Sequence, residues 1–403
     1  MAIQQSKNTI SMKTLLLFVI PLLLGSCNNQ TQETDSTFIT KSKQTLDSLY
    51  QHFGVSESNL LRETFPYDDQ HKATYLASES AADTPNAYSY LWPYSGTLSA
   101  VTALLESTKE NQYKELLDNK VLPGLECYFD TERKPAGYAS YIQGAPTSDR
   151  FYDDNVWLGI DFTDIYRLTK EQPYLDKAKL IWDFVISGHD DLLEGGIYWC
   201  EQRKNGKNTC SNAPGAVFAL KLYEATKDKY YLDWGIKLYN WTKTYLQDPS
   251  DFLFYDNINL NGATDKKKYA YNSGQMIQAA SLLYKITKEK NYLEDAQNIA
   301  SASYNFFFEE YSKTNNQQNY KIIKNGDIWF TAVMLRGFVE LYTLDKNAVY
   351  INSFKENLTN AWTDMRESNG LFNTDWKGIK KDEKKWLLTQ GAMVEMYARL
   401  ANY

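Results

Sequence analysis

Ala225-Thr226-Lys227-Asp228, followed by Tyr230-Tyr231-Leu232-Asp233, ends one helical pattern in a short polar turn and starts the next. Similar turns with a Tyr-Leu pair occur at residues 167–176 and 286–294, and weaker copies occur at residues 109–113 and 344–350. Successive marker tyrosines are 61, 57, 61 and 58 residues apart: Tyr113, Tyr174, Tyr231, Tyr292 and Tyr350. A period near sixty residues predicts a repeated unit of helix, tight turn, helix and long loop.

The two helices of each unit differ in composition. First helices carry small residues within an apolar run, such as Gly159 and Gly274, which let neighbouring helices approach closely. They are predicted to begin near residues 93, 154, 213, 272, 328 and 388. Second helices have separate charged and apolar faces, as expected of an outer layer. Their clearest copies lie at residues 172–187, 230–246 and 290–308.

Two helical stretches are left without a partner. Residues 38–53 precede the first unit, and the last inner helix, which begins at Leu388, ends the chain. Pairing them closes a circle of six inner and six outer helices. The sequence therefore predicts an all-α fold, the (α/α)6 toroid, with an open helical solenoid as the alternative.

The connections from outer to inner helices are long and rich in Tyr, Trp, Asn, Gly and Asp. They span residues 129–152, 188–212, 247–271, 309–327 and 366–387. In a toroid these loops all gather where the inner helices begin. A rigid scaffold that presents many loops at one end is typical of a binding or catalytic face.

Tyr152-Asp153-Asp154-Asn155-Val156-Trp157 places two adjacent carboxylates at that end, at the start of an inner helix. The positive helix terminus favours ionised carboxylates. A retaining glycosidase needs two carboxyl groups about 5–5.5 Å apart, which neighbouring residues can provide. The alternative is an Asp-Asp helix cap without a chemical role.

Four motifs, in order and at matching spacing, resemble those of glycoside hydrolase family 76. They are residues 91–95, 152–155, 207–215 and 270–275, and the likeness extends over about residues 85–400. The resemblance implies a retaining endo-α-1,6-mannanase that acts on a fungal or yeast-type α-mannan. It also implies that Asp153 is the nucleophile and Asp154 the general acid/base.

Further residues at the loop end are candidates for binding the sugar. The expected substrate-binding residues are Tyr152, Trp92, Tyr94, Asn212, Asp256, Tyr271, Asn272 and Gln275. For several of them a structural role is the alternative: Asn212 and Asn272 could cap helices, and Trp92 and Tyr94 could pack in the core. Three other tryptophans are expected to pack more than to line a cleft: Trp157, Trp199 and Trp329.

The N-terminus resembles a bacterial lipoprotein signal. A short positive region precedes about a dozen apolar residues in 12–27, and Leu24-Gly25-Ser26-Cys27 resembles a lipobox. We expect a lipoprotein signal peptide at residues 1–27 that ends at the lipidated Cys27, a polar tether at residues 28–37 and a catalytic domain at 38–403. Translation could start at Met12, and a cleaved soluble signal is the alternative. The expected location is the outer membrane, on its cell-surface or periplasmic face.

Composition excludes some classes of function. A net charge of −7 without a basic block argues against nucleic-acid binding. The three histidines, His52, His71 and His189, show no metal-ligand spacing, so we expect neither a metal nor a cofactor. We expect Cys127 to be a buried free thiol and leave open whether Cys200 and Cys210 form a disulfide. Nothing indicates an oligomer, so a monomer is expected.

Other functions fit the same fold. A mannan-acting transglycosylase would share the covalent intermediate and differ in the acceptor. A non-catalytic glycan-binding lipoprotein would keep the cleft, although a binder has no need of two adjacent carboxylates. An unsaturated-uronyl hydrolase does not share the ordered motifs. Endo against exo action, product length and tolerance of side chains stay open from the sequence.

Overall fold

The structure is a computed structural model that describes Met1 and residues 29–77, 86–313 and 318–403. The signal peptide predicted at residues 1–27 lies outside them except for Met1, and so does Cys27. Among the helices so described, none combines the length and the apolar character that crossing a bilayer requires.

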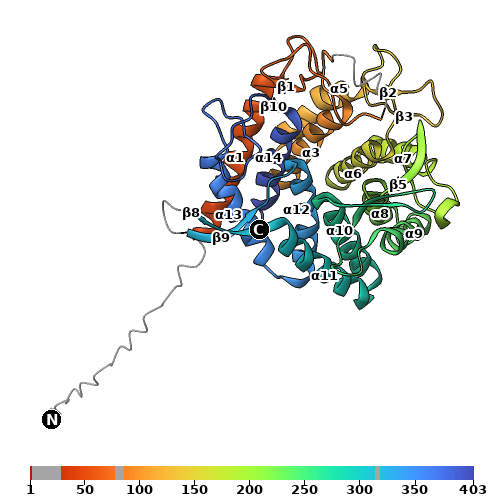
Figure 1. The fold of residues 1–403 in the computed structure, drawn as a ribbon. Coiled ribbons are helices and arrows are strands. Elements are labelled where there is room, and N and C mark those ends of the chain that lie inside the picture. The colour runs from red at the N-terminus through yellow and green to blue at the C-terminus, as the bar shows by residue number, and fades with distance from the viewer. Residues whose placement is uncertain (2–28, 78–85, 314–317) are drawn as a thin grey trace.

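Within the described residues, six helices form a closed inner ring in which each contacts the next and the last contacts the first (Figure 1). They are α3 (Leu91–Thr108), α6 (Tyr152–Thr169), α8 (Thr209–Thr226), α10 (Ala270–Thr287), α12 (Ile328–Asp345) and α14 (Leu387–Leu400). Each begins within four residues of its predicted start. The closed ring confirms the (α/α)6 toroid and excludes the open solenoid.

An outer helix packs against each inner helix (Figure 1). The outer layer comprises α1 (Asn29–Phe53), the broken helix α4–η1–α5 (Asn111–Leu116, Leu117–Val121, Leu122–Glu126), α7 (Gln172–Ile186), α9 (Lys229–Leu246), α11 (Lys290–Phe307) and α13 (Val349–Asp364). Helix α1 packs on α14 and closes the circle, as predicted. It begins at Asn29, so helical backbone includes residues that the sequence assigns to the tether.

The Thr-Lys turn of the repeat ends four inner helices in the same way. In α8, Thr226 Oγ1 donates to Leu222 O at 2.7 Å and accepts from Asp228 N at 3.2 Å. Lys227 takes a left-handed φ of 62° and its N–H bonds to Tyr223 O. The same contacts occur at Thr108-Lys109, Thr169-Lys170 and Thr287-Lys288. The repeat is therefore a repeated helix-ending device that satisfies the last carbonyl groups.

Small residues allow the inner helices to touch backbone to backbone. A Cβ on Gly337 would lie 2.2 Å from Gly274 O, and one on Gly274 would lie 2.4 Å from Met334 Cα. Across the α3–α14 contact, a Cβ on Gly391 would lie 2.7 Å from Gly96 O. These distances leave no room for a side chain, which explains the glycines within the apolar runs.

The long loops contain short antiparallel strands that the sequence analysis did not predict. The pairs are β1 (Thr64–Phe65) with β10 (Lys385–Trp386), β2 (Phe129–Asp130) with β3 (Gly137–Tyr138), and β8 (Phe308–Lys313) with β9 (Gln318–Ile323). A four-stranded sheet contains β4 (Tyr198–Cys200), β5 (Arg203–Asn208), β6 (Tyr255–Asn259) and β7 (Thr264–Lys268), in that order. A 3-10 turn, η2 (Leu192–Glu194), precedes β4. The sheet joins two loops of the repeat, with Lys207 opposite Ile258.

Side-chain amides attach three of these loops to the ring. The fourth residue of α6, α8 and α14 binds both the N–H and the C=O of one loop residue. The pairs are Asn155 with Tyr138 (2.8 and 2.9 Å), Asn212 with Ile197 (2.7 and 2.9 Å) and Gln390 with Phe372 (2.8 and 3.1 Å). Each amide thus bonds to the loop backbone as a neighbouring strand would, and it fixes the loop on its inner helix.

The cysteines differ from expectation in two respects. Cys200 and Cys210 are buried free thiols and form no disulfide. Cys127 is free, as predicted, but it is exposed, because it follows the C-terminal end of α5 on the outside of the ring.

Candidate active site

Asp153 and Asp154 are the second and third residues of α6. The residue before the helix, Phe151, has extended backbone angles (φ −95°, ψ 133°) and pairs with Cys200 of β4. The helix therefore starts where a strand-like segment turns inward. Because the cap position belongs to Phe151, the helix-cap interpretation of the two aspartates does not hold.

Asp153 is held from the side of β4. The indole N–H of Trp199 donates to its Oδ2 at 3.1 Å, whereas its Oδ1 is buried without a hydrogen bond of ordinary geometry from the described residues. Burial raises the pKa of Asp153 to about 7, against hydrogen bonds from Cys210, the backbone of Asp154 and Trp199 that lower it.

Asp154 is 8% exposed and has fewer compensating contacts. Burial, and then the negative charge of Asp153, raise the pKa of Asp154 well above its ordinary value. No ion pair joins either carboxylate to a cation among the described residues. Because only Asp153 receives hydrogen bonds that favour its ionised form, burial and the neighbouring charge raise the pKa of Asp154 further than that of Asp153.

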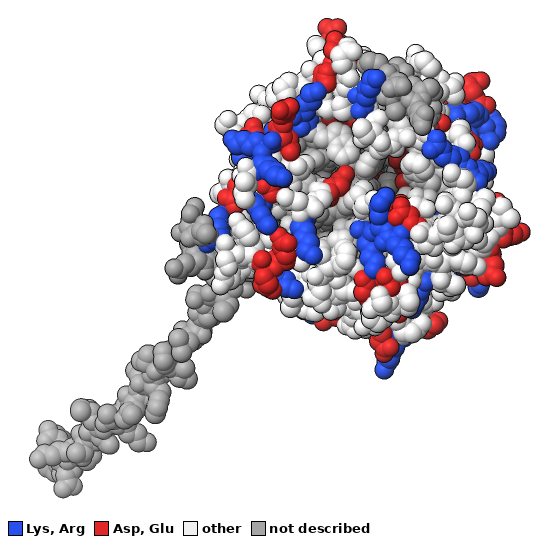
Figure 2. All heavy atoms as spheres, viewed as in Figure 1, with Lys and Arg blue, Asp and Glu red and all other residues white. Residues whose placement is uncertain are grey.

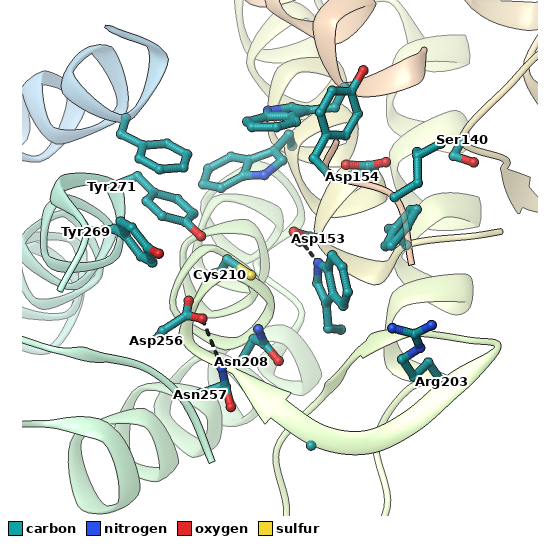
Figure 3. Close-up of a pocket in the computed structure, with 18 of the residues that line it drawn as sticks. Ser140, Asp153, Asp154, Arg203, Asn208, Cys210, Asp256, Asn257, Tyr269 and Tyr271 are labelled. Carbon is teal, nitrogen blue, oxygen red and sulfur yellow. Dashed lines mark hydrogen bonds between the residues drawn. The ribbon is translucent and has the colours of Figure 1, made fainter. Parts of the chain in front are cut away.

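Both carboxyl groups open into a cavity of about 470 Å³ at the N-terminal ends of the inner helices (Figure 3). Figure 2 shows this face of the molecule, which is hollowed near its centre. Five of the six inner helices and the four-stranded sheet contribute to the lining. It comprises Tyr75, Leu76, Tyr90, Trp92, Ser140, Phe151, Asp153, Asp154, Trp157, Trp199, Arg203, Asn205, Gly206, Asn208, Cys210, Asp256, Asn257, Asn259, Tyr269, Tyr271, Trp329 and Phe330.

One side of the cavity is an aromatic wall. Trp92 packs edge to face against Tyr75 (5.0 Å between centroids) and Trp329 (5.6 Å). Tyr271 stacks on Phe330 at 4.0 Å with 14° between the rings. Flat aromatic faces with polar edges suit the apolar faces of a pyranose ring.

A buried carboxylate, Glu63, orders this wall. Its oxygens accept from Tyr75 Oη at 2.6 Å, Tyr90 N at 2.9 Å and Asn86 Nδ2 at 3.0 Å. Trp386, which packs on Trp92, donates to it at 3.4 Å. Nothing in the sequence near Glu63 indicated this role, because its partners come from three separate segments.

The opposite side is polar and comes from β5 and β6. Asn205, Asn208, Asn257 and Asn259 offer amide groups to the cavity, and Arg203 lies at its edge (Figure 3). Asp256, whose pKa is raised by burial, accepts from Asn257 Nδ2 at 2.9 Å. Amides and a guanidinium are suitable partners for sugar hydroxyl groups.

The structure brings part of the predicted site together. Asp153, Asp154, Trp92, Asp256 and Tyr271 line the cavity.

Five predicted substrate-binding residues lie outside the lining, and four of them have structural contacts instead. Tyr152 stacks on Phe184, and Tyr94 donates to Asn59 O and Val121 O. Asn212 anchors Ile197, and Gln275 donates to Gln278. Asn272 is fully buried, and neither polar atom of its amide has a hydrogen bond of ordinary geometry from the described residues. The side chains of the other four meet structural partners, a direction that position at a helix start does not fix.

The sequence analysis missed other lining residues. Trp157, Trp199 and Trp329 were expected to pack, and all three line the cavity while being largely buried. The asparagines of β5 and β6 were not selected at all. One available signal was Asn261-Gly262, a hairpin turn between two polar runs, in which Gly262 has a φ of 84°.

Comparisons with known proteins agree with this geometry. A family model described as glycosyl hydrolase family 76 matches residues 65–403. A solved structure of a family 76 glycoside hydrolase (mannosidase) from Bacteroides thetaiotaomicron is 36% identical, with a TM-score of 0.82, over 91% of this chain and 98% of that one. An α-1,6-mannanase of Salegentibacter sp. HEL1_6 is 25% identical, with a TM-score of 0.72, over 91% and 99%. That structure is an inactive variant, with two adjacent aspartates changed to asparagine, in complex with α-1,6-mannotriose.

A curated fungal relative, the mannan endo-1,6-alpha-mannosidase DCW1 of Candida glabrata, is 28% identical over 147 residues. The match covers 34% of this chain and 31% of that protein. The chain spans less than half the length of the curated relatives it matches.

Proposed function

The chain belongs to glycosyl hydrolase family 76, and from that premise we propose that it is a retaining endo-α-1,6-mannanase. The observation that supports the proposal most is the Asp153–Asp154 pair, which lines the cavity, pairs with no cation among the described residues and has the pKa of both carboxyl groups raised by burial. The α-1,6-mannotriose bound by the Salegentibacter relative indicates the class of substrate.

In the first step, the ionised carboxylate of Asp153 attacks the anomeric carbon of a mannosyl unit. The bond from that carbon to the O6 oxygen of the next mannose breaks as Asp154 transfers its proton to this oxygen. The raised pKa of Asp154 keeps the required proton in place near neutral pH. The products are a covalent mannosyl ester on Asp153 and a shortened mannan with a free hydroxyl group.

In the second step, Asp154 accepts a proton from water, and the water oxygen attacks the same anomeric carbon. The ester bond to Asp153 breaks, and its carboxylate leaves ionised. Two inversions give net retention of configuration. The single proton on the pair is thus given in one step and recovered in the other.

The cavity walls fit a neutral, hydroxyl-rich polymer. The aromatic wall around Trp92 covers apolar sugar faces, and the amides of β5 and β6 face the hydroxyl groups. The α-1,6-mannotriose bound by the Salegentibacter relative, an oligosaccharide and not a single sugar, supports cleavage within a polymer over removal of single end residues.

The test is a time course of unbranched α-1,6-mannan digestion by the purified protein. We expect an early ladder of mannooligosaccharides, with NMR showing the α-anomer as the first product. Mannose alone from the start would contradict endo action, and the β-anomer would contradict retention. Binding without any release would favour the non-catalytic glycan-binding lipoprotein.

A mannan-acting transglycosylase is the second candidate, since it passes through the same ester. The digest distinguishes it when a mannooligosaccharide acceptor is added in excess. Products longer than the acceptor, formed in preference to reducing ends from water, would favour transfer over hydrolysis.

We also propose that a lipid on Cys27 anchors the domain to the outer membrane and that the protein is a monomer. The lipobox-like Leu24–Cys27 segment supports the anchor. Detergent partition of the native protein and of a Cys27→Ala variant tests it: the native protein should enter the detergent phase and the variant should not. Light scattering of the detergent-free variant tests the monomer.

A further inference from the structure

Cys210 lies in the cavity wall, where the sequence offered it only as half of a disulfide. It is the second residue of α8, is 3% exposed, and forms no disulfide. Figure 3 shows its sulfur between the side chains of Tyr271 and Asp153. Three inner helices therefore meet at this sulfur: α6, α8 and α10.

The two oxygens of Asp153 have different surroundings. Oδ2 accepts from the indole of Trp199 at 3.1 Å. Oδ1 is buried and has no hydrogen bond of ordinary geometry from the described residues. A thiol hydrogen rotates freely about the Cβ–Sγ bond, so the S–H of Cys210 can turn toward this oxygen.

The sulfur is protonated, because burial raises the pKa of Cys210 well above its ordinary value, and the charges of Asp153 and Asp256 raise it further. A hydrogen bond from Tyr271 opposes this shift. Cys210 is thus a thiol that can donate to Asp153 and accept from Tyr271, rather than a reactive thiolate.

We propose that Cys210 is a positioning residue for Asp153, with its S–H donated to Oδ1 and its sulfur accepting the hydroxyl of Tyr271. Together with Trp199, it holds both oxygens of the carboxylate and fixes the plane of the group. The role as a positioning residue for a nucleophile rests on the proposed function, whereas the hydrogen bond itself does not.

A hydrogen-bond donor to Asp153 stabilises the ionised form of Asp153. It therefore favours ionisation of Asp153 over ionisation of Asp154. The titratable and charged groups around it are Asp154 on α6, Cys200 on β4, Arg203 on β5, Cys210 on α8, Asp256 on β6 and Tyr271 on α10, with Tyr75 facing Asp154. Of the uncharged groups in this set, Cys210 is the one whose hydrogen bond lowers the pKa of Asp153 most. The thiol therefore helps to keep the proton of the pair on Asp154.

The kinetic test compares Cys210→Ala, Cys210→Ser and a matched control, Cys200→Ala. Cys200 is also a buried free thiol, but it does not line the cavity. We expect Cys210→Ala to move the acidic limb of the kcat/KM profile on α-1,6-mannotetraose up by roughly 0.5 to 1 pH unit, since a weak donor to the carboxylate is lost. Cys210→Ser should restore the limb, and Cys200→Ala should leave it in place. An unmoved limb in Cys210→Ala, or an equal shift in the control, overturns the proposal.

A second measurement needs no mannanase activity. In a Cys27→Ala/Cys127→Ala/Cys200→Ala background, Cys210 is the one cysteine left in the sequence, and its S–H stretch can be followed by infrared spectroscopy. Removal of the acceptor in Asp153→Ala should shift the band to higher frequency, and an unchanged band would refute the hydrogen bond. Because the spectrum does not depend on turnover, an inactive wild-type protein would overturn the proposed function and leave this bond to be judged on its own.

Discussion

Helix α6 buries carboxylates of opposite character at its two ends. Asp153 and Asp154, in its first turn, have no cation, and burial raises the pKa of both. Asp164, about three turns further, is bound by Lys221 Nζ of α8 at 2.6 and 2.7 Å. Burial alone would raise its pKa as well, but the charges of Lys221 and Arg167 lower it.

The two ends lie on the same helix, and both bury aspartate side chains. They differ in whether a neighbouring cation compensates the buried negative charge. At Asp164 the packing supplies a cation, so the carboxylate stays ionised and joins α6 to α8. At Asp153 and Asp154 it supplies only weak hydrogen bonds, so a proton remains within reach of a ligand. The reactivity that we propose for this pair would follow from burial of carboxyl groups that no cation compensates.

The largest effect should come from removing the uncompensated pair. Asp153→Asn keeps the shape of the side chain and loses the carboxylate that we propose as the nucleophile, so we expect kcat on α-1,6-mannan to fall roughly 10⁴-fold or more. Asp154→Asn should lower it roughly 10²- to 10⁴-fold, with the smaller loss on substrates whose leaving group needs no proton. Initial rates on mannan and on an aryl mannoside measure both. Activity near that of the wild type in either variant would contradict the mechanism.

Removing the cation that pairs with Asp164 should lower the stability of the fold. Lys221→Ala leaves Asp164 buried with only the more distant Arg167, at 3.5 Å, and we expect a loss of about 3–5 kcal/mol in the free energy of unfolding. The control is Lys229→Ala, which breaks an exposed pair with Asp233 and should cost less than about 1 kcal/mol. Urea unfolding measures both losses. Equal losses would show that the buried pair is not a special feature of the ring.

The two ends should also respond oppositely to pH. Folding raises the pKa of Asp153 from 3.8 to about 7, so its contribution to stability is complete below about pH 4 and is lost as the pH rises toward 7. Folding lowers the pKa of Asp164, so its contribution is present above the unfolded value and is lost as the pH falls.

Stability curves of Asp153→Asn and the wild type should therefore diverge between about pH 4 and pH 7, with the variant gaining relative stability as the pH rises. The slope of the difference cannot exceed about 1.4 kcal/mol per pH unit for one proton. Chemical unfolding at a series of pH values measures it. Parallel curves would mean that the pKa of Asp153 does not change on folding.

The smallest effect concerns the weak compensation of Asp153. Trp199→Phe keeps a ring in the cavity and removes the N–H donated to Oδ2, which should raise the pKa of Asp153 and lower kcat/KM roughly three- to tenfold below neutral pH. The control is Trp241→Phe, whose indole donates to Leu193 O away from the cavity. Trp241→Phe should leave the pH profile of kcat/KM unchanged. An equal shift of the profile in both variants would contradict a specific role for the Trp199 N–H.

Local sequence was sufficient for the scaffold. The Thr-Lys turns and the tyrosines after them act between residues close in the chain, so their spacing located six inner helices to within four residues. The glycines at contacts such as Gly274–Gly337 were visible as small residues in apolar runs, although their partners were not. The Asp153–Asp154 pair was found because it stands at a helix start that the repeat itself defined.

The rest of the site depends on contacts between distant segments. The amides of the polar wall reach the cavity because β5 pairs with β6, with Gly206 opposite Asn259, a register no local pattern reveals. The aromatic wall depends on Glu63, whose partners extend to Trp386. Asn212 and Tyr94 were placed correctly along their helices, but their side chains turn toward structural partners.

The sequence by itself therefore determined the toroid, the end of it where the long loops gather and the position of the two acidic residues there, because helices, turns and their period depend on residues close together in the chain. Only the tertiary structure decided which side chains enter the cavity, that Cys210 is a thiol beside Asp153, and that the acidic pair lacks a cation. Each of these depends on what packing brings together, or fails to bring, from parts of the chain far apart.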